Sequence, residues 1–223
     1  MADSARELLD RIRREVAGEH GENRFLPLVA AGRVPVGVIG ALAAEESRIV
    51  PGDWRAFLTL AARAEDPAGR AFFSGLAQGE SLALPLLPPL AAAAGLDEHA
   101  VRAYRPRPGC QAYAAYVGWL ALNARPEVAA LAMLTNFAEF GAYCGSLAGA
   151  LREHYGFADD AVAFFEFFGS PVPELEEQGL AAVQAGLDAG VSFDGAVEIV
   201  RLLQGFELLF WNTLAELAGH PAG

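Results

Sequence analysis

The chain of 223 residues contains no lysine, and all sixteen of its basic residues are arginine. Without lysine it cannot form a Schiff base with a carbonyl substrate or with pyridoxal phosphate, and it has no phosphate-binding loop of the Walker type. Basic charge is scarce too, because sixteen arginines face 28 carboxylates and leave a net charge of −12 at pH 7. This balance repels a phosphate backbone, so nucleic acid is not an expected partner.

Cysteine and long apolar runs are also scarce. The two cysteines, Cys110 and Cys144, have no CxxC spacing, and we expect both to stay reduced. No run reaches the ~18 uncharged residues of a membrane helix, because prolines interrupt the stretch 82–96. Residues 1–19 have the pattern of an amphipathic helix rather than that of a signal peptide. We therefore expect a cytoplasmic protein that does not bind membranes.

Apolar residues recur every three or four positions, which is the period of helices, and no stretch alternates like a strand. Prolines 85, 88 and 89 should bend or end the helix that begins near residue 67. No linker or repeat divides the chain, so we predict one all-α bundle over 1–223, with a first helix in 1–19 and a short tail at 219–223. Turn and cap residues separate helices expected near 3–17, 22–31, 36–63, 67–94, 97–103, 109–123, 126–154, 158–168, 172–189 and 192–218.

Some acidic residues fall on apolar stripes of these expected helices, namely Glu46, Glu80, Glu139 and Glu207. Residues three and four positions away share a helix face, and Glu207 has Phe210 and Trp211 at these positions. An ionised carboxylate that is buried alone is costly, so it needs a partner or a raised pKa. Two interpretations stay open: the four converge in a functional site, or some of them cap helices or pair with Arg48 or Arg201.

Convergent glutamates in a helical bundle also suggest a di-iron centre, which requires Glu-x-x-His on two helices. None of the four histidines has a glutamate three residues before it. His20, His99 and His154 each directly follow a glutamate instead, so the two side chains point in different directions. We therefore expect neither a metal ion nor another cofactor.

Other chemical motifs are few, since no nucleophile elbow, dinucleotide-binding loop or metalloprotease motif occurs. Cys144 has no histidine three or four residues away and is expected as a small buried residue. The phenylalanines of 164–168 can wall an apolar pocket or fill the core. Tyr113 and Tyr116 share one helix face and can contact a ligand or the core.

Taken in order, several segments carry a family resemblance: 23–35 (NRFLPLVAAGRVP), Glu46, 63–67 (RAEDP), 108–116 (PGCQAYAAY), 131–140 (LAMLTNFAEF) and 207–211 (ELLFW). In this order, they resemble six features of the TenA (thiaminase II) family. The first three are the opening His-Pro-Phe segment, the substrate-binding acid and the Lys-Ala-x-Asp turn. The last three are the Tyr-x-x-Tyr segment, the Leu-x-x-Leu-x-Pro-Cys segment and the C-terminal Glu-x-x-Phe-Trp motif. The last of these motifs is the most specific.

This resemblance implies a heme-oxygenase-like multi-helix bundle with a central pocket, assembled as a dimer or tetramer. Family members hydrolyse a C–N bond of an aminopyrimidine related to thiamine, with a cysteine nucleophile and the C-terminal glutamate as proton carrier. Asn136 stands at the cysteine position, and an amide cannot form that covalent intermediate. Asn23 and Ile49 likewise replace a histidine and a tyrosine. Some branches of the family rely on carboxylates instead, so the absence of the cysteine does not exclude hydrolysis.

The sequence thus predicts a metal-free hydrolase of an aminopyrimidine or related heteroaromatic, driven by carboxylates. Glu207 would be the general acid and base, Glu46 would bind the ring nitrogens and the amino group, and Glu139 would orient substrate or water. The other substrate-binding residues would be Tyr113, Tyr116, Asn136, Phe210 and Trp211.

Two alternatives stay open. One is a small-molecule-binding homologue without catalysis, suggested by Asn136. The other is a heme-oxygenase-like oxidase acting on a larger apolar metabolite. The oxidases of the superfamily pair a glutamate with a histidine seven residues later, whereas Glu80 is followed at that distance by Leu87.

Overall fold

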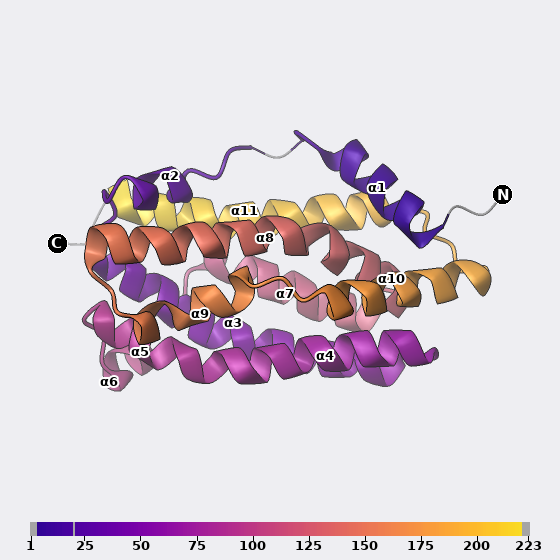
Figure 1. Cartoon of the computed structure of the whole chain (residues 1–223), viewed down its shortest axis with the longest axis horizontal. Coiled ribbons are helices and arrows are strands. Elements are labelled where there is room, and N and C mark those ends of the chain that lie inside the picture. The colour runs from indigo at the N-terminus through magenta and orange to yellow at the C-terminus, as the bar shows by residue number, and fades with distance from the viewer. Residues whose placement is uncertain (1–3, 20, 220–223) are drawn as a thin grey trace.

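The computed structural model describes residues 4–19 and 21–219, which form an elongated all-α bundle (Figure 1). No strand occurs in these two ranges. The expected helices are confirmed, with ends that differ by a few residues. The elements are α1 (Ala5–Val16), α2 (Phe25–Ala30), α3 (Val36–Arg63), α4 (Pro67–Ala83), the 3-10 turn η1 (Leu84–Leu86), α5 (Leu87–Ala93), α6 (Glu98–Ala103), α7 (Pro108–Asn123), α8 (Pro126–Tyr155), α9 (Asp159–Gly169), α10 (Pro173–Asp188) and α11 (Ala196–Gly219).

The break predicted at the proline cluster is present. α4 ends at Ala83, Pro85 lies in η1, and α5 begins at Leu87 with Pro88 in its first turn. Proline is well tolerated there because the first N–H groups of a helix have no partner within the helix. Pro51, in contrast, lies inside α3, which continues through it.

The long helices pack in a ring of pairs. α3 packs against α4 and α7, α7 packs against α11, and α11 packs against α8. α10 bridges α8 and α4, and α9 packs against α8 and α5. In Figure 1, α9 and α10 lie end to end in front of the bundle, between α8 and α4.

The hydrophobic core is divided into two clusters. The first includes Phe25, Leu42 and Leu90, and the second includes Leu9, Phe72 and Leu120. α3, α8 and α11 run through both clusters, so the middle of each of these helices falls between them. Polar side chains at those central positions can therefore face a space that neither cluster fills.

Candidate active site

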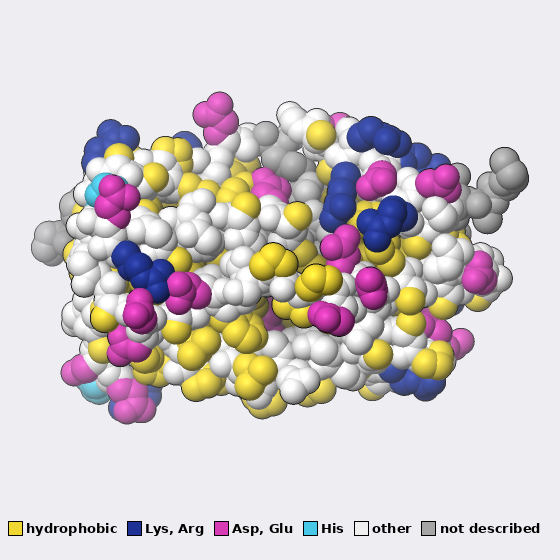
Figure 2. Space-filling view, viewed as in Figure 1, with side chains coloured by type: hydrophobic (Ala, Val, Ile, Leu, Met, Phe, Trp, Pro, Cys, Tyr) yellow, Lys and Arg dark blue, Asp and Glu magenta, His cyan; other side chains and the backbone are white. Residues whose placement is uncertain are grey.

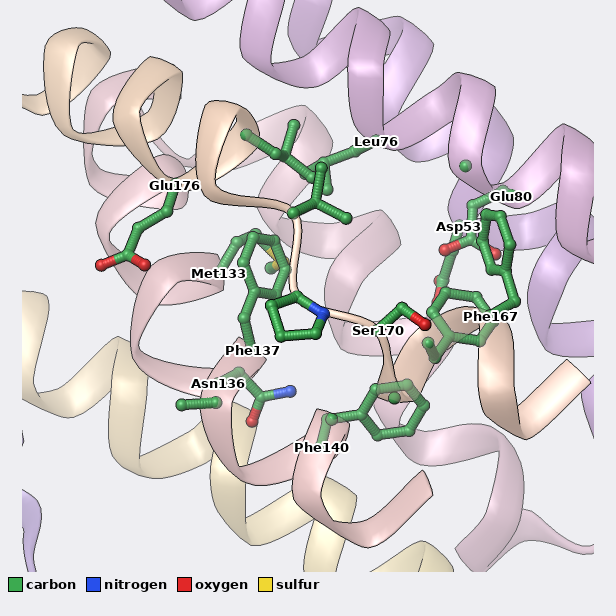
Figure 3. Close-up of a pocket in the computed structure, with 18 of the residues that line it drawn as sticks. Asp53, Leu76, Glu80, Met133, Asn136, Phe137, Phe140, Phe167, Ser170 and Glu176 are labelled. Atoms are coloured by element: carbon green, nitrogen blue, oxygen red, sulfur yellow. The ribbon is translucent and has the colours of Figure 1, made fainter. Parts of the chain in front are cut away.

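A cavity of about 1080 Å³ opens at this central level of the bundle (Figure 3). Its walls come from α3, α4, α7, α8, α9, α10 and α11, and Arg13 of α1 and the segment between α9 and α10 also line it. This volume lies just above the range of roughly 300–1,000 Å³ that is typical of small-molecule sites. The cavity can therefore hold a ligand larger than a single aromatic ring.

Six acidic side chains line this cavity. The exposed Glu174 and Glu176 come from α10, and the other four come from three further helices. Glu46 and Asp53 lie two turns apart on α3, which puts them on one face of that helix, while Glu80 comes from α4 and Glu207 from α11. Glu46, Asp53 and Glu207 are buried. Within residues 4–19 and 21–219, no salt bridge reaches any of the four.

Burial without a cation raises the pKa of these carboxyl groups. Loss of hydration raises the pKa of Glu46 to about 8, and the charges of Asp53, Glu45 and Glu207 add to this effect. Burial likewise raises the pKa of Asp53 and that of Glu80, and for Glu80 the charges of Asp53 and Glu46 contribute further. At neutral pH, part of this cluster therefore carries protons.

Glu207 has the most specific surroundings of the four. The indole Nε1–H of Trp211, one turn later on α11, donates to Glu207 Oε1 over 3.2 Å. Burial raises the pKa of Glu207 to about 7, although hydrogen bonds with Trp211 and Asn136 lower it and the charge of Glu139 raises it. A carboxyl group with a pKa near the working pH is suited to both accepting and donating a proton.

Aromatic rings also line the cavity. Phe140 lies with its ring centre 5.5 Å from that of Phe168 and 6.5 Å from that of Trp211, and Phe210 packs edge-on against Trp211 at 4.8 Å. Both interpretations of the phenylalanines in 164–168 hold in part, because some of these rings line the cavity while Phe165 is buried in the core. The other rings at the wall are Phe137, Phe164 and Phe167.

The sequence and the fold are similar to those of known proteins. The model of the TENA/THI-4/PQQC family matches residues 14–216. The chain belongs to this family. None of the curated proteins matches the sequence at a significant level.

Two solved structures share the TenA fold. A TenA homologue from P. horikoshii OT3 superposes with a TM-score of 0.70 at 17% identity, over 96% of this chain and 99% of that one. A TenA family transcription regulator from Silicibacter sp. TM1040 superposes with a TM-score of 0.63 at 13% identity, over 96% and 97%. These likenesses confirm the all-α TenA-like bundle.

Several residues predicted for a TenA-type site do line the cavity: Glu46, Tyr113, Asn136, Glu207, Phe210 and Trp211. Asn136 is buried, and its Oδ1 has no hydrogen-bond partner in the described residues. Burial raises the pKa of Tyr113, and the charges of Asp53 and Glu207 add to this. Tyr113 therefore keeps its hydroxyl proton beside the carboxylates.

Glu139 does not line the cavity, and the prediction that it lies on a buried stripe is wrong. Its side chain is exposed and accepts a hydrogen bond from the Tyr143 hydroxyl. Ala142, three positions later on the same helix face, is itself exposed. Alanine is common on solvated helix faces because it forms helices well, so it is a poor marker of burial.

Tyr116 is also separated from the cavity. Its ring stacks on Trp119 at 5.6 Å with an interplanar angle of 5°, and it contacts Phe206 on α11 at 5.2 Å. Positions three apart on a helix differ by about 60° in direction, because a turn takes 3.6 residues. Tyr113 therefore faces the cavity, whereas Tyr116 packs against α11 outside the cavity.

No thiol lines the cavity in the part of the chain that the structure describes. Both cysteines are free and buried, as expected, and neither lines the cavity. Burial raises the pKa of the Cys110 and Cys144 thiols, which disfavours the reactive thiolate. Asn23, which the sequence resemblance aligns with the family's histidine, accepts hydrogen bonds from the backbone N–H groups of Phe25 and Leu26 at the start of α2.

The described ranges contain no evident cluster of metal-ligating side chains. No three His, Cys, Asp or Glu side chains there have an arrangement that could hold a metal ion. His99 and His154 are exposed, and His154 Nε2 lies 2.8 Å from the Ala30 carbonyl oxygen. His20 and His220 lie outside the described residues. The described helices also include none with the length and hydropathy needed to cross a membrane.

Asp53 is the site residue that the sequence predictions missed. Its neighbours three and four positions away are Ile49, Val50, Ala56 and Phe57, all of them buried. The neighbour test that selected Glu46 and Glu207 therefore selects Asp53 as well. Glu80 was selected as a buried acid but was given no role, and the structure places it beside Asp53 (Figure 3).

Proposed function

We propose that the chain is a TenA-type hydrolase that replaces an amino group of an aminopyrimidine, or of a related heteroaromatic, with a hydroxyl group. The observation that carries this proposal is the position of Glu207, which is buried at the cavity wall with a pKa raised to about 7. Such a group can move protons without a metal or a covalent intermediate. Membership of the TenA family supports the same class of reaction.

In this mechanism, the Glu207 carboxylate takes a proton from a water molecule in the cavity. The hydroxide forms a C–O bond to the carbon that carries the amino group, and the C–N bond breaks. Protonated Glu207 then gives its proton to the departing nitrogen. One water is consumed and one ammonia is released, and Glu207 returns to its starting state.

Glu46 would recognise the heteroaromatic ring. Because burial raises its pKa to about 8, this carboxyl group carries a proton at neutral pH. A neutral carboxyl group donates through its O–H and accepts through its carbonyl oxygen. It can therefore pair with a ring nitrogen and the amino group beside it, while the rings of Phe140 and Trp211 flank the heterocycle.

A protein that binds such a ligand without converting it is the second candidate. The observation that favours it is the buried Oδ1 of Asn136, which has no hydrogen-bond partner in the described residues, at the position predicted for the family's nucleophile. This oxygen can accept a hydrogen bond from a ligand, but it cannot attack one.

Ammonia release and thermal unfolding separate these two candidates. We expect wild-type protein to release ammonia from an aminomethyl-substituted aminopyrimidine, and Glu207→Gln to do so about 10²–10⁴-fold more slowly while still binding it. A ligand at 100 times its Kd stabilises the folded state by about 2.7 kcal/mol, which a melting curve detects. Stabilisation without ammonia release would support the binding protein. Absence of both would overturn both candidates.

We also propose that the chain assembles as a dimer or tetramer in the cytoplasm. Large apolar side chains are exposed on the adjacent helices α7 and α11, where Tyr116 and Phe206 join the two surfaces. The exposed members are Trp119, Leu122, Leu202 and Leu209. Light scattering on the wild type and on Leu122→Glu tests this proposal, since a charge at the interface should produce monomers.

A further inference from the structure

The mechanism above gives no task to the cavity acids Asp53 and Glu80. Asp53 on α3 and Glu80 on α4 lie side by side at the cavity wall, as Figure 3 shows, and the charge of Asp53 acts on Glu80. They come from helices that pack along each other, so the fold brings them together rather than the local sequence. Both line the same cavity as Glu207.

Asp53 shows that this pair is incomplete. The residue is 5% exposed, and its Oδ1 has no hydrogen-bond partner in the structure. A buried carboxylate oxygen without a donor is costly, and native proteins satisfy nearly all such atoms. An unfilled acceptor at a cavity wall is therefore the place where a ligand would present a donor.

The charged groups nearby show what kind of donor fits. The other titratable groups around the pair are Glu46, Glu207 and Tyr113, none of which is a cation. Arg13 also lines the cavity, but it donates from Nη2 to the carbonyl oxygen of Leu134 over 2.7 Å. Figure 2 shows the arginines of this face in several separate places, near α1 and also at the opposite end of the molecule. The pair thus lies among acidic groups that no salt bridge in the described residues neutralises, so a positively charged donor would favour their ionised forms.

We propose that Asp53 and Glu80 form a subsite that binds the ammonium group of a ligand whose aromatic body lies along the phenylalanine wall. An ammonium nitrogen offers three N–H donors and the charge that this part of the cavity lacks. The volume of about 1080 Å³ leaves room for an arm between the ring and the amine. The inference rests on the proposed function, because it names the substrate class of the same site. The substrates would be aminated heteroaromatics that carry a second, cationic amine in addition to the amino group that is replaced.

A matched pair of probes tests this subsite by calorimetry. 4-Phenylbutylamine carries an aromatic ring and an ammonium group, and 4-phenylbutan-1-ol has the same length without the charge. We expect wild-type protein to bind the amine about tenfold or more tightly than the alcohol, because a hydrogen bond to a charged group is stronger than a neutral one. Asp53→Asn/Glu80→Gln should bind both probes equally.

The alcohol also serves as a control for folding, since its affinity should be the same in wild type and double variant. If the double variant does not fold, each single variant is expected to lose part of the preference. Glu176→Gln, at an exposed position of the cavity rim, should keep the full preference. Equal affinities in wild type, binding of neither probe at millimolar concentration, or a preference that survives in the double variant would overturn the subsite.

The outcome is separable from that of the hydrolase proposal. Glu207→Gln should lose ammonia release and keep the preference for the amine. Wild-type protein that prefers the amine but releases no ammonia would contradict the hydrolase and retain the subsite. Ammonia release without any preference for the amine would do the reverse.

Discussion

Glu45 and Glu46 are adjacent on α3 and both are buried, but they face two different regions of the molecule. Glu45 points toward the segment between α6 and α7, where Oε1 accepts hydrogen bonds from the Tyr104 hydroxyl at 2.9 Å and from the Arg107 backbone N–H at 2.8 Å. Gln111 donates to its other oxygen. Glu46 points into the cavity, where its neighbours are other carboxyl groups.

The comparison shows that burial alone does not mark a functional acid. At Glu45, three donors replace the lost water, so the carboxylate holds a loop against the bundle. At Glu46, burial removes the hydration of the carboxylate and the surrounding charges have the same sign, so the pKa rises and the ionised group is costly to keep. A protein tolerates such a cost where a ligand supplies the missing partners.

The largest expected effect is a loss of stability as the pH rises. The folded pKa values of Glu46 and Glu207, about 8 and about 7, lie above the ordinary value of 4.5. Between these values the folded state binds more protons than the unfolded state. The contribution of these two groups to the free energy of unfolding is therefore fully present below pH 4.5 and is lost as the pH passes 8. We expect the free energy of unfolding to fall by on the order of 4 kcal/mol between pH 5 and 8, measured by urea unfolding. A flat profile would contradict the unpaired cluster.

The next largest effect is expected at the structural acid. Glu45→Ala leaves the Tyr104 hydroxyl, the Arg107 N–H and the Gln111 amide without their acceptor. We expect a loss of roughly 3 kcal/mol in unfolding free energy, because a buried donor without a partner costs 1–3 kcal/mol. Glu45→Gln, which keeps one acceptor, should lose less. A loss below about 1 kcal/mol would mean that these bonds contribute little.

The sequence predicted the helices and much of the site because both depend on local spacing. The period of apolar residues fixed the course of α3, α8 and α11, and the Glu-x-x-Phe-Trp motif placed Trp211 one turn from Glu207. The same spacing rule identifies Asp53, whose neighbours are as apolar as those of Glu46.

The rest depended on which helices pack together, and local spacing does not contain that information. Asp53 meets Glu80 because α3 packs on α4, and Glu45 is satisfied by a loop about sixty residues later, with sequence separations of 59 and 62 to its donors. Glu139 and Tyr116 were predicted at the site from approximate helix faces, and each lies one step of about 60° or more from the inward direction.

A smaller effect of opposite sign is expected at Glu46. Glu46→Gln removes the ionised form that burial and like charges disfavour, so at pH 8 the variant should be more stable than the wild type by roughly 2 kcal/mol. At pH 5, where the wild-type group is protonated, the two proteins should unfold alike. Glu45→Gln is the matched control on the adjacent position and should destabilise at both pH values. Equal changes at the two positions would contradict the distinction between the two regions.

The smallest effect is expected at Glu139, which touches the site only through its charge. Because the Glu139 carboxylate raises the pKa of Glu207 from an exposed position, Glu139→Gln should move the acid limb of the ammonia-release profile to lower pH by a few tenths of a unit. The maximal rate should stay within about twofold, and added salt should reduce the wild-type shift by screening. Tyr143→Phe, which removes the hydrogen bond to Glu139 but not the charge, should leave the profile near that of the wild type. A hundredfold loss of rate in Glu139→Gln would instead mean that this carboxylate reaches the substrate, and proton transfer would then be shared between α8 and α11.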